Sequence, residues 1–146
     1  MAVTVKKVVL WRKEIDNCPG MLASTLEPLF EAGADLEVVM AYRYPDGADT
    51  VAVELQPVSS RKPVAAAKKV GLAPSDIAAL LVQGDNRRGL GHAITKAISD
   101  AGINMNFVMA QVVGRRYSAM FGFANEADAA KATPVIKKAM APVRKK

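Results

Sequence analysis

The residues best suited to chemistry in this chain form a short polar loop that occurs twice. Residues 16–20 read Asp-Asn-Cys-Pro-Gly, and sixty-nine positions later residues 85–89 read Asp-Asn-Arg-Arg-Gly. Each loop follows an apolar run and precedes a helical pattern, so the first N–H groups of a helix would lie beside carboxylate and amide side chains. Such a loop suits a zwitterion, whose carboxylate accepts from N–H groups and whose ammonium donates to an Asp.

Two features of the loops keep an ordinary structural interpretation open. Gly20 and Gly89 would let a ligand approach the backbone without a Cβ in the way. However, Asp16 or Asn17 could simply cap the following helix, with Pro19 in its first turn. A duplicated fold duplicates its caps as well as its sites, so the repeat alone does not separate the two interpretations.

The whole chain repeats at the same offset without an insertion. The matching pairs are Ala32-Gly33 with Ala101-Gly102, Met40-Ala41 with Met109-Ala110, and Lys68-Lys69 with Lys137-Lys138. This pattern predicts a duplicated small domain, with domains at 1–72 and 73–146. Domains of this size are marginally stable alone, so we expect the halves to pack closely and the chain to form a homodimer.

Apolar periodicity and turn residues predict the same order of elements in each half. In the first half they predict a strand at 5–15, a helix from 19 to Gly33 that bends or ends early at Pro28, strands at 36–44 and 50–55 around a turn at 45–47, and a helix at 62–70 with Ser59 or Ser60 as its cap. In the second half they predict a strand at 77–83, a helix at 90–101, strands at 104–113 and 118–124, and a helix from Asn125 or Glu126 with a kink at Pro134.

This order predicts an α+β fold. A ferredoxin-like βαββα(β) unit occurs twice, and each unit has an antiparallel sheet with its helices on one face, the two units packing side by side. Many functions use this architecture, so the fold alone does not decide the function.

Composition excludes several classes of protein. Cys18 and His92 are the only residues of their types, so we expect no disulfide, no metal site and no cofactor. The apolar runs are shorter than a membrane span and no leader pattern is present, so we expect a cytoplasmic protein that does not bind membranes. The net charge of +6 arises entirely in the second half, which could attract an anionic ligand.

The order of these motifs resembles that of an ACT domain. The features that carry the resemblance are an apolar strand, Asp-Asn-x-Pro-Gly, an amphipathic helix ending in Ala-Gly, and a strand that restarts at once. The second copy, from Gly89 to Gln111, is similar to those of aspartate kinases. The resemblance covers nearly the whole chain twice and implies a small-molecule sensor, usually of amino acids, that can regulate an enzyme.

The resemblance also implies where a ligand would lie. ACT domains pair side by side through their sheets and hold the ligand between the first loop of one copy and the second strand of its neighbour. That arrangement would use Asp16, Asn17, Gly20 and Met21 from one copy, Asp85, Asn86, Gly89 and Leu90 from the other, and Asn104, Met105 and Gln111 at the second strand. Because Arg87 and Arg88 replace Cys18 and Pro19, the two loops cannot be chemically equivalent.

Two other classes of function remain open on the sequence. An enzyme could use Cys18, near a helix start, as a nucleophile with His92 as its base. An RNA-binding protein could stack bases on Phe121 and Phe123, although nucleic-acid binding is not expected because the chain is only 5% aromatic. A protein-interaction module without a small ligand would use the same fold.

Overall fold

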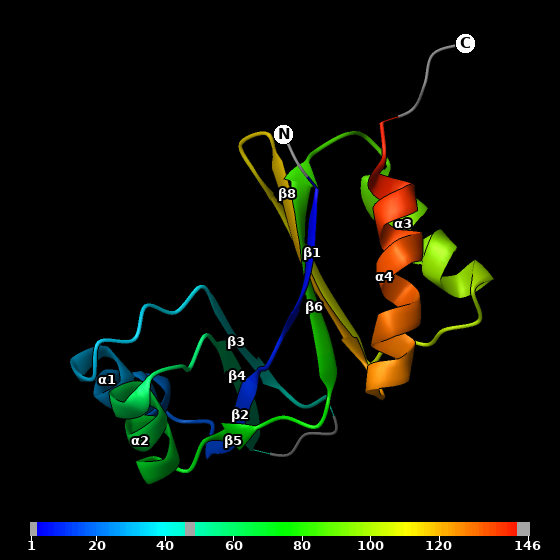
Figure 1. The fold of residues 1–146 in the computed structure, drawn as a ribbon. Coiled ribbons are helices and arrows are strands. Elements are labelled where there is room, and N and C mark those ends of the chain that lie inside the picture. The colour runs from blue at the N-terminus through cyan, green and yellow to red at the C-terminus, as the bar shows by residue number, and fades with distance from the viewer. Residues whose placement is uncertain (1–2, 46–48, 143–146) are drawn as a thin grey trace. The chain divides into compact units, whose positions relative to one another are not determined.

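In the computed structural model, the chain divides into two compact units. We call Val9–Ser75 the inserted unit, because it lies within the sequence of the other. The split unit consists of Met1–Val8 and Asp76–Lys146. The structure describes residues 3–45 and 49–142. Each unit is an antiparallel sheet with two helices packed on one face (Figure 1), which confirms the predicted α+β class and the repeated ferredoxin-like unit. The side-by-side packing of the two units stays a prediction.

The inserted unit has the order strand, helix, two strands, helix, strand. Its elements are β2 (Trp11–Asp16), α1 (Met21–Glu31), β3 (Val38–Arg43), β4 (Thr50–Gln56), α2 (Arg61–Lys69) and β5 (Ala73–Pro74). The strands lie in the order β3-β4-β2-β5. Alternate residues of β2 and β4, such as Trp11 and Val53, join Leu29 of α1 in the core, as the period of a half-buried strand requires.

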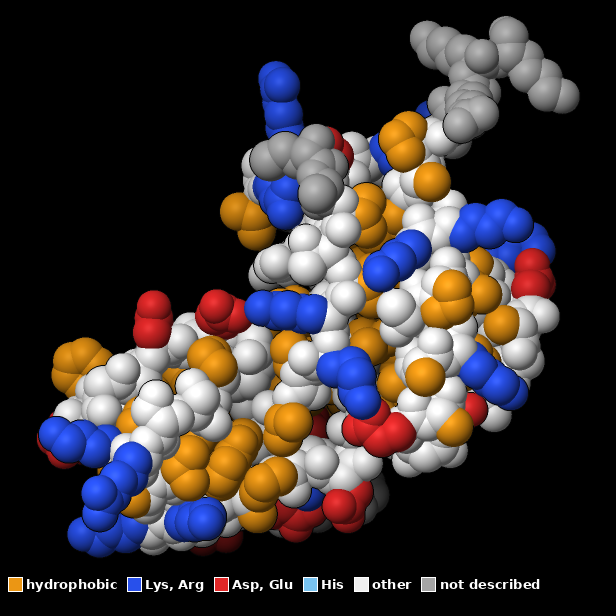
Figure 2. Space-filling model, in the orientation of Figure 1, with side chains coloured by type: hydrophobic (Ala, Val, Ile, Leu, Met, Phe, Trp, Pro, Cys, Tyr) orange, Lys and Arg blue, Asp and Glu red, His pale blue; other side chains and the backbone are white. Residues whose placement is uncertain are grey.

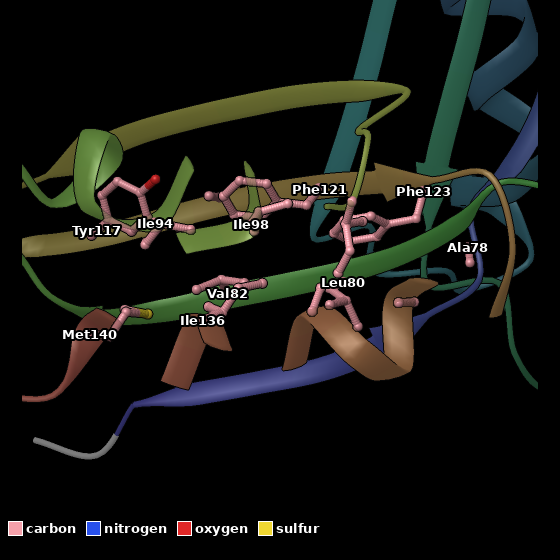
Figure 3. Packing of buried hydrophobic residues seen from close by; sticks show 14 of the residues in the cluster. Ala78, Leu80, Val82, Ile94, Ile98, Tyr117, Phe121, Phe123, Ile136 and Met140 are labelled. Carbon is pink, nitrogen blue, oxygen red and sulfur yellow. The ribbon is translucent and has the colours of Figure 1, made fainter. Parts of the chain in front are cut away.

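The split unit contains the remaining elements. They are β1 (Thr4–Val8), β6 (Ala78–Asp85), α3 (Leu90–Asp100), β7 (Phe107–Val113), β8 (Arg116–Phe123) and α4 (Glu126–Met140), with the strand order β1-β6-β8-β7. Figure 3 shows how Leu80 and Val82 of β6 meet Phe121 of β8 and the helix residues Ile98 and Ile136. This core lies between the sheet and the two helices.

The N-terminal strand completes the sheet of the split unit. β1 pairs antiparallel with β6, at the edge position that β5 occupies beside β2 in the inserted unit. Val3 and Met140 both lie beside Gly84, so the start of β1 and the end of α4 are close together. The split unit is therefore a circularly permuted version of the inserted unit, because its sixth element precedes its first in the sequence.

The predicted strand at 5–15 is wrong in one respect, because it is two strands. Val9 and Leu10 separate β1 from β2, and the two strands pair in different sheets. Leu10 is fully buried, so the apolar run continues through the break and gives no sign of it. The domain bounds 1–72 and 73–146 describe the sequence repeat and stay a prediction. The compact units of the structure have different bounds, Val9–Ser75 for one and Met1–Val8 with Asp76–Lys146 for the other.

The expectation of a repeat without insertions is also wrong. Ile15 lies opposite Val51, and its repeat equivalent Gly84 lies opposite Tyr117, so the partners are only 66 positions apart (51 to 117). The second hairpin is therefore three residues shorter than the first. The greater length of α4, which has 15 residues where α2 has nine, restores the offset at the lysine pairs.

Other element boundaries agree with the sequence to within a few residues. Helix α1 continues through Pro28 to Glu31, so it does not end early there, and the bends predicted at Pro28 and Pro134 stay predictions. Asn125 caps α4 by accepting from the Asp128 N–H at 2.8 Å. The predicted turn at 45–47 falls partly on residues 46–48, which lie outside the described residues. Within the described ranges, no helix has the length and apolarity needed to cross a membrane.

Candidate ligand-binding loops

The first polar loop connects β2 to α1 in the inserted unit, and the second connects β6 to α3 in the split unit. Gly20 and Gly89 are the N-cap residues, with φ of +88° and +82°, a conformation that glycine adopts without the strain other residues incur. Neither helix has a side-chain cap, so the predicted cap role of Asp16 or Asn17 is wrong. Those residues lie too far before the helix, because the glycine itself occupies the cap position.

Backbone hydrogen bonds fix both loops to the neighbouring hairpin. The Asn17 N–H donates to the Asp49 carbonyl at 3.0 Å, and the Asn86 N–H donates to the Arg115 carbonyl at 2.8 Å. Both Asn side chains are exposed. The loops therefore have a fixed backbone at each Asn, and the Asn side chains are accessible to a ligand.

The helix starts leave N–H groups without acceptors inside the helix. In α1 the first bond of the helical ladder runs from the Ser24 N–H to the Gly20 carbonyl at 2.9 Å. The N–H groups of Leu22 and Ala23 precede it, so they have no acceptor in the helix. With the positive end of the helix dipole, they form a setting that favours a carboxylate.

The acidic residues of the two loops differ in their partners. Asp85 lies 3.8 Å from the guanidinium of Arg116, which stands opposite it across β8. Thr50 takes the corresponding place opposite Asp16, whose exposed carboxylate has no ion pair with any described residue. The inserted unit thus keeps an unneutralised carboxylate beside a helix start, whereas the split unit does not.

The arginines of the second loop also have different environments. Arg87 donates to the carbonyl of Ala139, which ties this loop to the end of α4. Arg88 is exposed. The sequence predicted that the loops are unequal, but it could not identify Arg116 as the partner of Asp85, because that pairing depends on the register of β6 and β8.

The remaining predicted site residues are only partly brought together. Leu90 is 2% exposed and belongs to the core of its unit, and Met21 packs against the core of the other, so these positions can offer little more than backbone. Gln111 of β7 stands opposite Ser118 of β8, and Ser118 in turn stands opposite Gln83 of β6. These residues lie near the loop end of the sheet.

Asn104 and Met105 lie at the other end of the same sheet. They precede Phe107, which stands level with Ala79, far along β6 from Asp85. Met105 also packs against the core. Within the split unit, therefore, Gln111 shares an end with the loop, and Asn104 and Met105 do not. The prediction that Asn104, Met105 and Gln111 form a ligand site with a loop of another copy stays a prediction.

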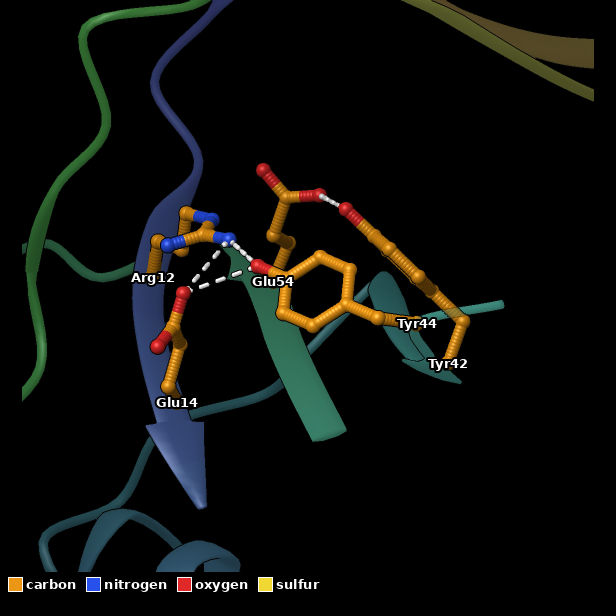
Figure 4. Close-up of polar contacts among 5 residues, drawn as sticks. All are labelled: Arg12, Glu14, Tyr42, Tyr44 and Glu54. Atoms are coloured by element: carbon orange, nitrogen blue, oxygen red, sulfur yellow. Dashed lines mark hydrogen bonds and ion pairs between the residues drawn. The ribbon is translucent and has the colours of Figure 1, made fainter. Parts of the chain in front are cut away.

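The structure also reveals a polar cluster that the sequence did not predict. On the sheet of the inserted unit, the Tyr42 hydroxyl donates to Glu54 at 3.1 Å, and the Tyr44 hydroxyl donates to Glu14 at 2.8 Å (Figure 4). Arg12 donates to the Tyr44 oxygen. Glu54 is fully buried, and its second oxygen has no hydrogen-bond partner among the described residues. The cluster joins three strands through side chains that alternate with core residues.

Burial and neighbouring charge shift the pKa values in this cluster. Partial burial and the nearby Glu54 carboxylate raise the pKa of Tyr42. The hydrogen bond from the Tyr44 hydroxyl to Glu14 raises the pKa of Tyr44. For Arg12, partial burial favours the neutral form, but the neighbouring Tyr44 and Glu54 outweigh it, so its pKa is raised. The tyrosines are therefore neutral hydrogen-bond donors near neutral pH.

The other residues singled out for chemistry are divided between the two units. Cys18 is exposed in the inserted unit, and His92 is exposed on α3 of the split unit. Among the residues that the structure describes, no three His, Cys, Asp or Glu side chains are grouped to hold a metal ion. Phe121 and Phe123 are fully buried in the core beneath the helices, so they cannot stack on RNA bases.

Comparison with solved structures identifies the fold. The chain matches the regulatory subunit of aspartate kinase from Thermus thermophilus at 18% identity and a TM-score of 0.65, over 95% of this chain and 97% of that one. A protein from Bacteroides thetaiotaomicron matches at 16% identity and a TM-score of 0.73, over 92% and 89% of the two chains.

A third match is to a complete enzyme. Aspartate kinase from Clostridium acetobutylicum matches at 17% identity and a TM-score of 0.63, over 94% of this chain but only 33% of the enzyme. No model of a known protein family matches the sequence, and neither does any curated protein. The likeness is therefore one of fold: the chain shares its two-unit α+β fold with the regulatory subunit of aspartate kinase from Thermus thermophilus, in line with the ACT resemblance of the sequence.

Proposed function

We propose that this chain is a non-catalytic sensor that binds an amino acid or a similar small metabolite. The observation that carries the proposal is the loop after β2. Asp16, whose carboxylate has no ion pair with a described residue, lies four residues before Gly20, the N-cap of a helix that has no side-chain cap. The shared fold with aspartate kinase regulatory subunits supports the same role. By analogy with them, the chain would regulate an enzyme. The homodimer and the cytoplasmic location stay predictions from the sequence.

The chemistry of the first loop matches both ends of a zwitterion. A ligand carboxylate would accept from the N–H groups of Leu22 and Ala23, where the helix dipole adds to its stabilisation. The ligand ammonium would donate to Asp16, and Asn17 can serve either group. The ACT resemblance adds that a second strand from a neighbouring copy would close the site.

The second loop is a poorer site for an ammonium group. Arg116 already neutralises Asp85, and Arg87 and Arg88 add positive charge. A ligand group bound there would more suitably be anionic. We therefore propose that Asp16 and Asn17 provide the ammonium contacts, and that the loop at Asp85, Asn86 and Gly89 contributes mainly to binding negative charge.

The test is a thermal-shift screen against the twenty amino acids, followed by calorimetric titration of any hit. A ligand at about a hundred times its Kd adds roughly 2.7 kcal/mol, which would raise the Tm by about 5 to 10 °C. In Asp16→Asn, loss of the charged contact should weaken binding about tenfold or more. The matched variant Asp85→Asn should change the affinity much less.

Either of two results would contradict the proposal. In the first, no amino acid or small metabolite stabilises the protein and a salt-sensitive RNA ligand does, which would favour nucleic-acid binding. In the second, Asp16→Asn and Asp85→Asn weaken binding equally, which would place the ammonium contacts elsewhere. Circular dichroism of both variants checks that the fold is retained.

A further inference from the structure

The helix layer of the split unit carries an apolar groove with a basic rim. A hollow of about 450 Å³ lies between α3 and α4. Its lining consists of Ala93, Lys96, Ala97 and Asp100 from α3, and Val135, Lys138 and Ala139 from α4. Figure 2 shows apolar side chains separated by Lys and Arg side chains over these helices. The small side chains on the floor would let a bulky side chain of a partner enter.

The charge around this groove is positive. Asp100, the acidic residue of the lining, is neutralised by Lys96 at 2.8 Å. Lys138 has no acidic partner among the described residues and is exposed. Lys131, about two turns before Lys138 on α4, is exposed on the same side. A partner surface that fits the groove must therefore be apolar at its centre and acidic at its margin.

Helix α1 of the inserted unit has such a surface. Phe30 is 78% exposed, more than any other large hydrophobic residue among those described. Glu27, three residues before Phe30, is exposed on the same side of the helix, and Glu31, one turn after Glu27, is exposed next to Glu27. Neither glutamate has an ion pair with a described residue. An exposed phenylalanine beside two carboxylates that have no ion pair with a described residue is a feature that a basic apolar groove would bury.

We propose that α1 of one chain docks into the α3/α4 groove of a second copy of the same chain. Phe30 enters the groove, and Glu27 and Glu31 pair with the lysines at its rim. The contact buries the most exposed apolar side chain and matches opposite charges, which favours both affinity and orientation. It uses different surfaces on the two copies, so it is a heterologous contact, distinct from the symmetric side-by-side homodimer of the proposed function.

Sedimentation velocity over a range of concentrations tests the contact. The wild-type chain should show an association that Phe30→Ser weakens about tenfold or more, as loss of a central aromatic anchor does. Lys138→Glu, which places a carboxylate opposite Glu27 and Glu31, should weaken it similarly. Val113→Ser is the matched control, because Val113 is also a well exposed hydrophobic residue but belongs to β7 and to neither of the two surfaces.

Mixing the two variants distinguishes this contact from others. Phe30→Ser retains an intact groove and Lys138→Glu retains an intact α1 surface, so an equimolar mixture should recover part of the faster-sedimenting species that each variant has lost alone. Identical sedimentation of wild type and Phe30→Ser would overturn the proposal, and so would a mixture that behaves as the sum of its parts. Amino-acid binding, measured separately by calorimetry, should be retained in both variants. Sedimentation therefore tests the contact between copies, and calorimetry tests the proposed function.

Discussion

At the scale of single residues, two loops that look alike in sequence differ in the residue that faces their aspartate, Asp16 or Asp85. Both begin with Asp-Asn and end with a glycine in the left-handed conformation. Opposite the aspartate, however, one loop has Thr50 and the other has Arg116. A carboxylate beside a guanidinium has already satisfied its charge, whereas an exposed carboxylate without a counter-ion can attract an ammonium ligand.

Tyr117, one residue after Arg116, gives a prediction about alkaline pH. Burial raises the pKa of Tyr117 above the ordinary value of about 10. The tyrosine therefore ionises in the unfolded chain before it ionises in the folded one, so it contributes stability below about pH 10 that is lost as the pH rises further. Denaturant unfolding of Tyr117→Phe should show a smaller loss of stability between about pH 9 and pH 11 than wild type.

The comparison at pH 7 provides the control. The Tyr117 hydroxyl makes no hydrogen bond to a described residue, so at neutral pH the variant should differ from wild type by less than about 1 kcal/mol. Parallel pH profiles for the two proteins would show that burial of Tyr117 does not favour its neutral form.

At the scale of elements, the packing of β7 against β8 depends on one glycine. Gly122 of β8 stands opposite Phe107 of β7, and a Cβ added to Gly122 would lie 2.2 Å from the phenylalanine ring. Aromatic side chains often cover glycines in neighbouring strands, because the missing side chain leaves room for the ring. The glycine is thus required by packing, unlike Gly20 and Gly89, where an added Cβ meets nothing within 4 Å and the backbone conformation is the constraint.

Replacement of Gly122 should therefore destabilise the split unit. In Gly122→Ala, the ring of Phe107 must move out of its place, and overpacking of this kind costs about 1–3 kcal/mol. Thermal or urea unfolding measures the change. A second substitution, Phe107→Ala, should recover much of the loss, because it removes the clash. A single Gly122→Ala variant as stable as wild type would show that the ring does not occupy that space.

At the scale of the whole molecule, the N-terminal strand belongs to the unit formed by the second half of the chain. β1 pairs with β6 along its full length, from Thr4 opposite Gln83 to Val8 opposite Ala79. The inserted unit closes the equivalent edge with only two residues, Ala73 and Pro74. Without β1, the split unit would expose the edge of β6, and unpaired strand edges promote aggregation.

A circular permutation tests this organisation. A fragment of residues 76–146 should aggregate or unfold readily, whereas the same fragment with residues 1–8 joined after α4 by a flexible Gly/Ser linker should fold cooperatively. The proximity of Val3 and Met140 to Gly84 makes such a connection short. Circular dichroism and urea unfolding compare the two fragments. Equal stability of the two would mean that β1 contributes nothing to the unit, contrary to its pairing.

The class of the fold and the position of its repeated loops follow from local signals in the sequence. Apolar periodicity, the glycines at 20, 33, 89 and 102, and the Asn125 cap are local signals, because they reflect backbone conformation and which face of an element is buried. They were enough to predict two α+β units with antiparallel sheets, most element boundaries, and the resemblance to ACT domains.

The pairing of the segments, in contrast, became visible in the three-dimensional fold. The break of the first strand at Val9 and Leu10, the pairing of β1 with β6 and the shorter second hairpin all depend on hydrogen bonds between residues far apart in sequence. The same is true of the ion pair between Asp85 and Arg116, the polar cluster around Glu54, and the separation of Asn104 and Met105 from the loop of their own unit. Strand register is set by long-range packing, and no local pattern in this sequence encodes it.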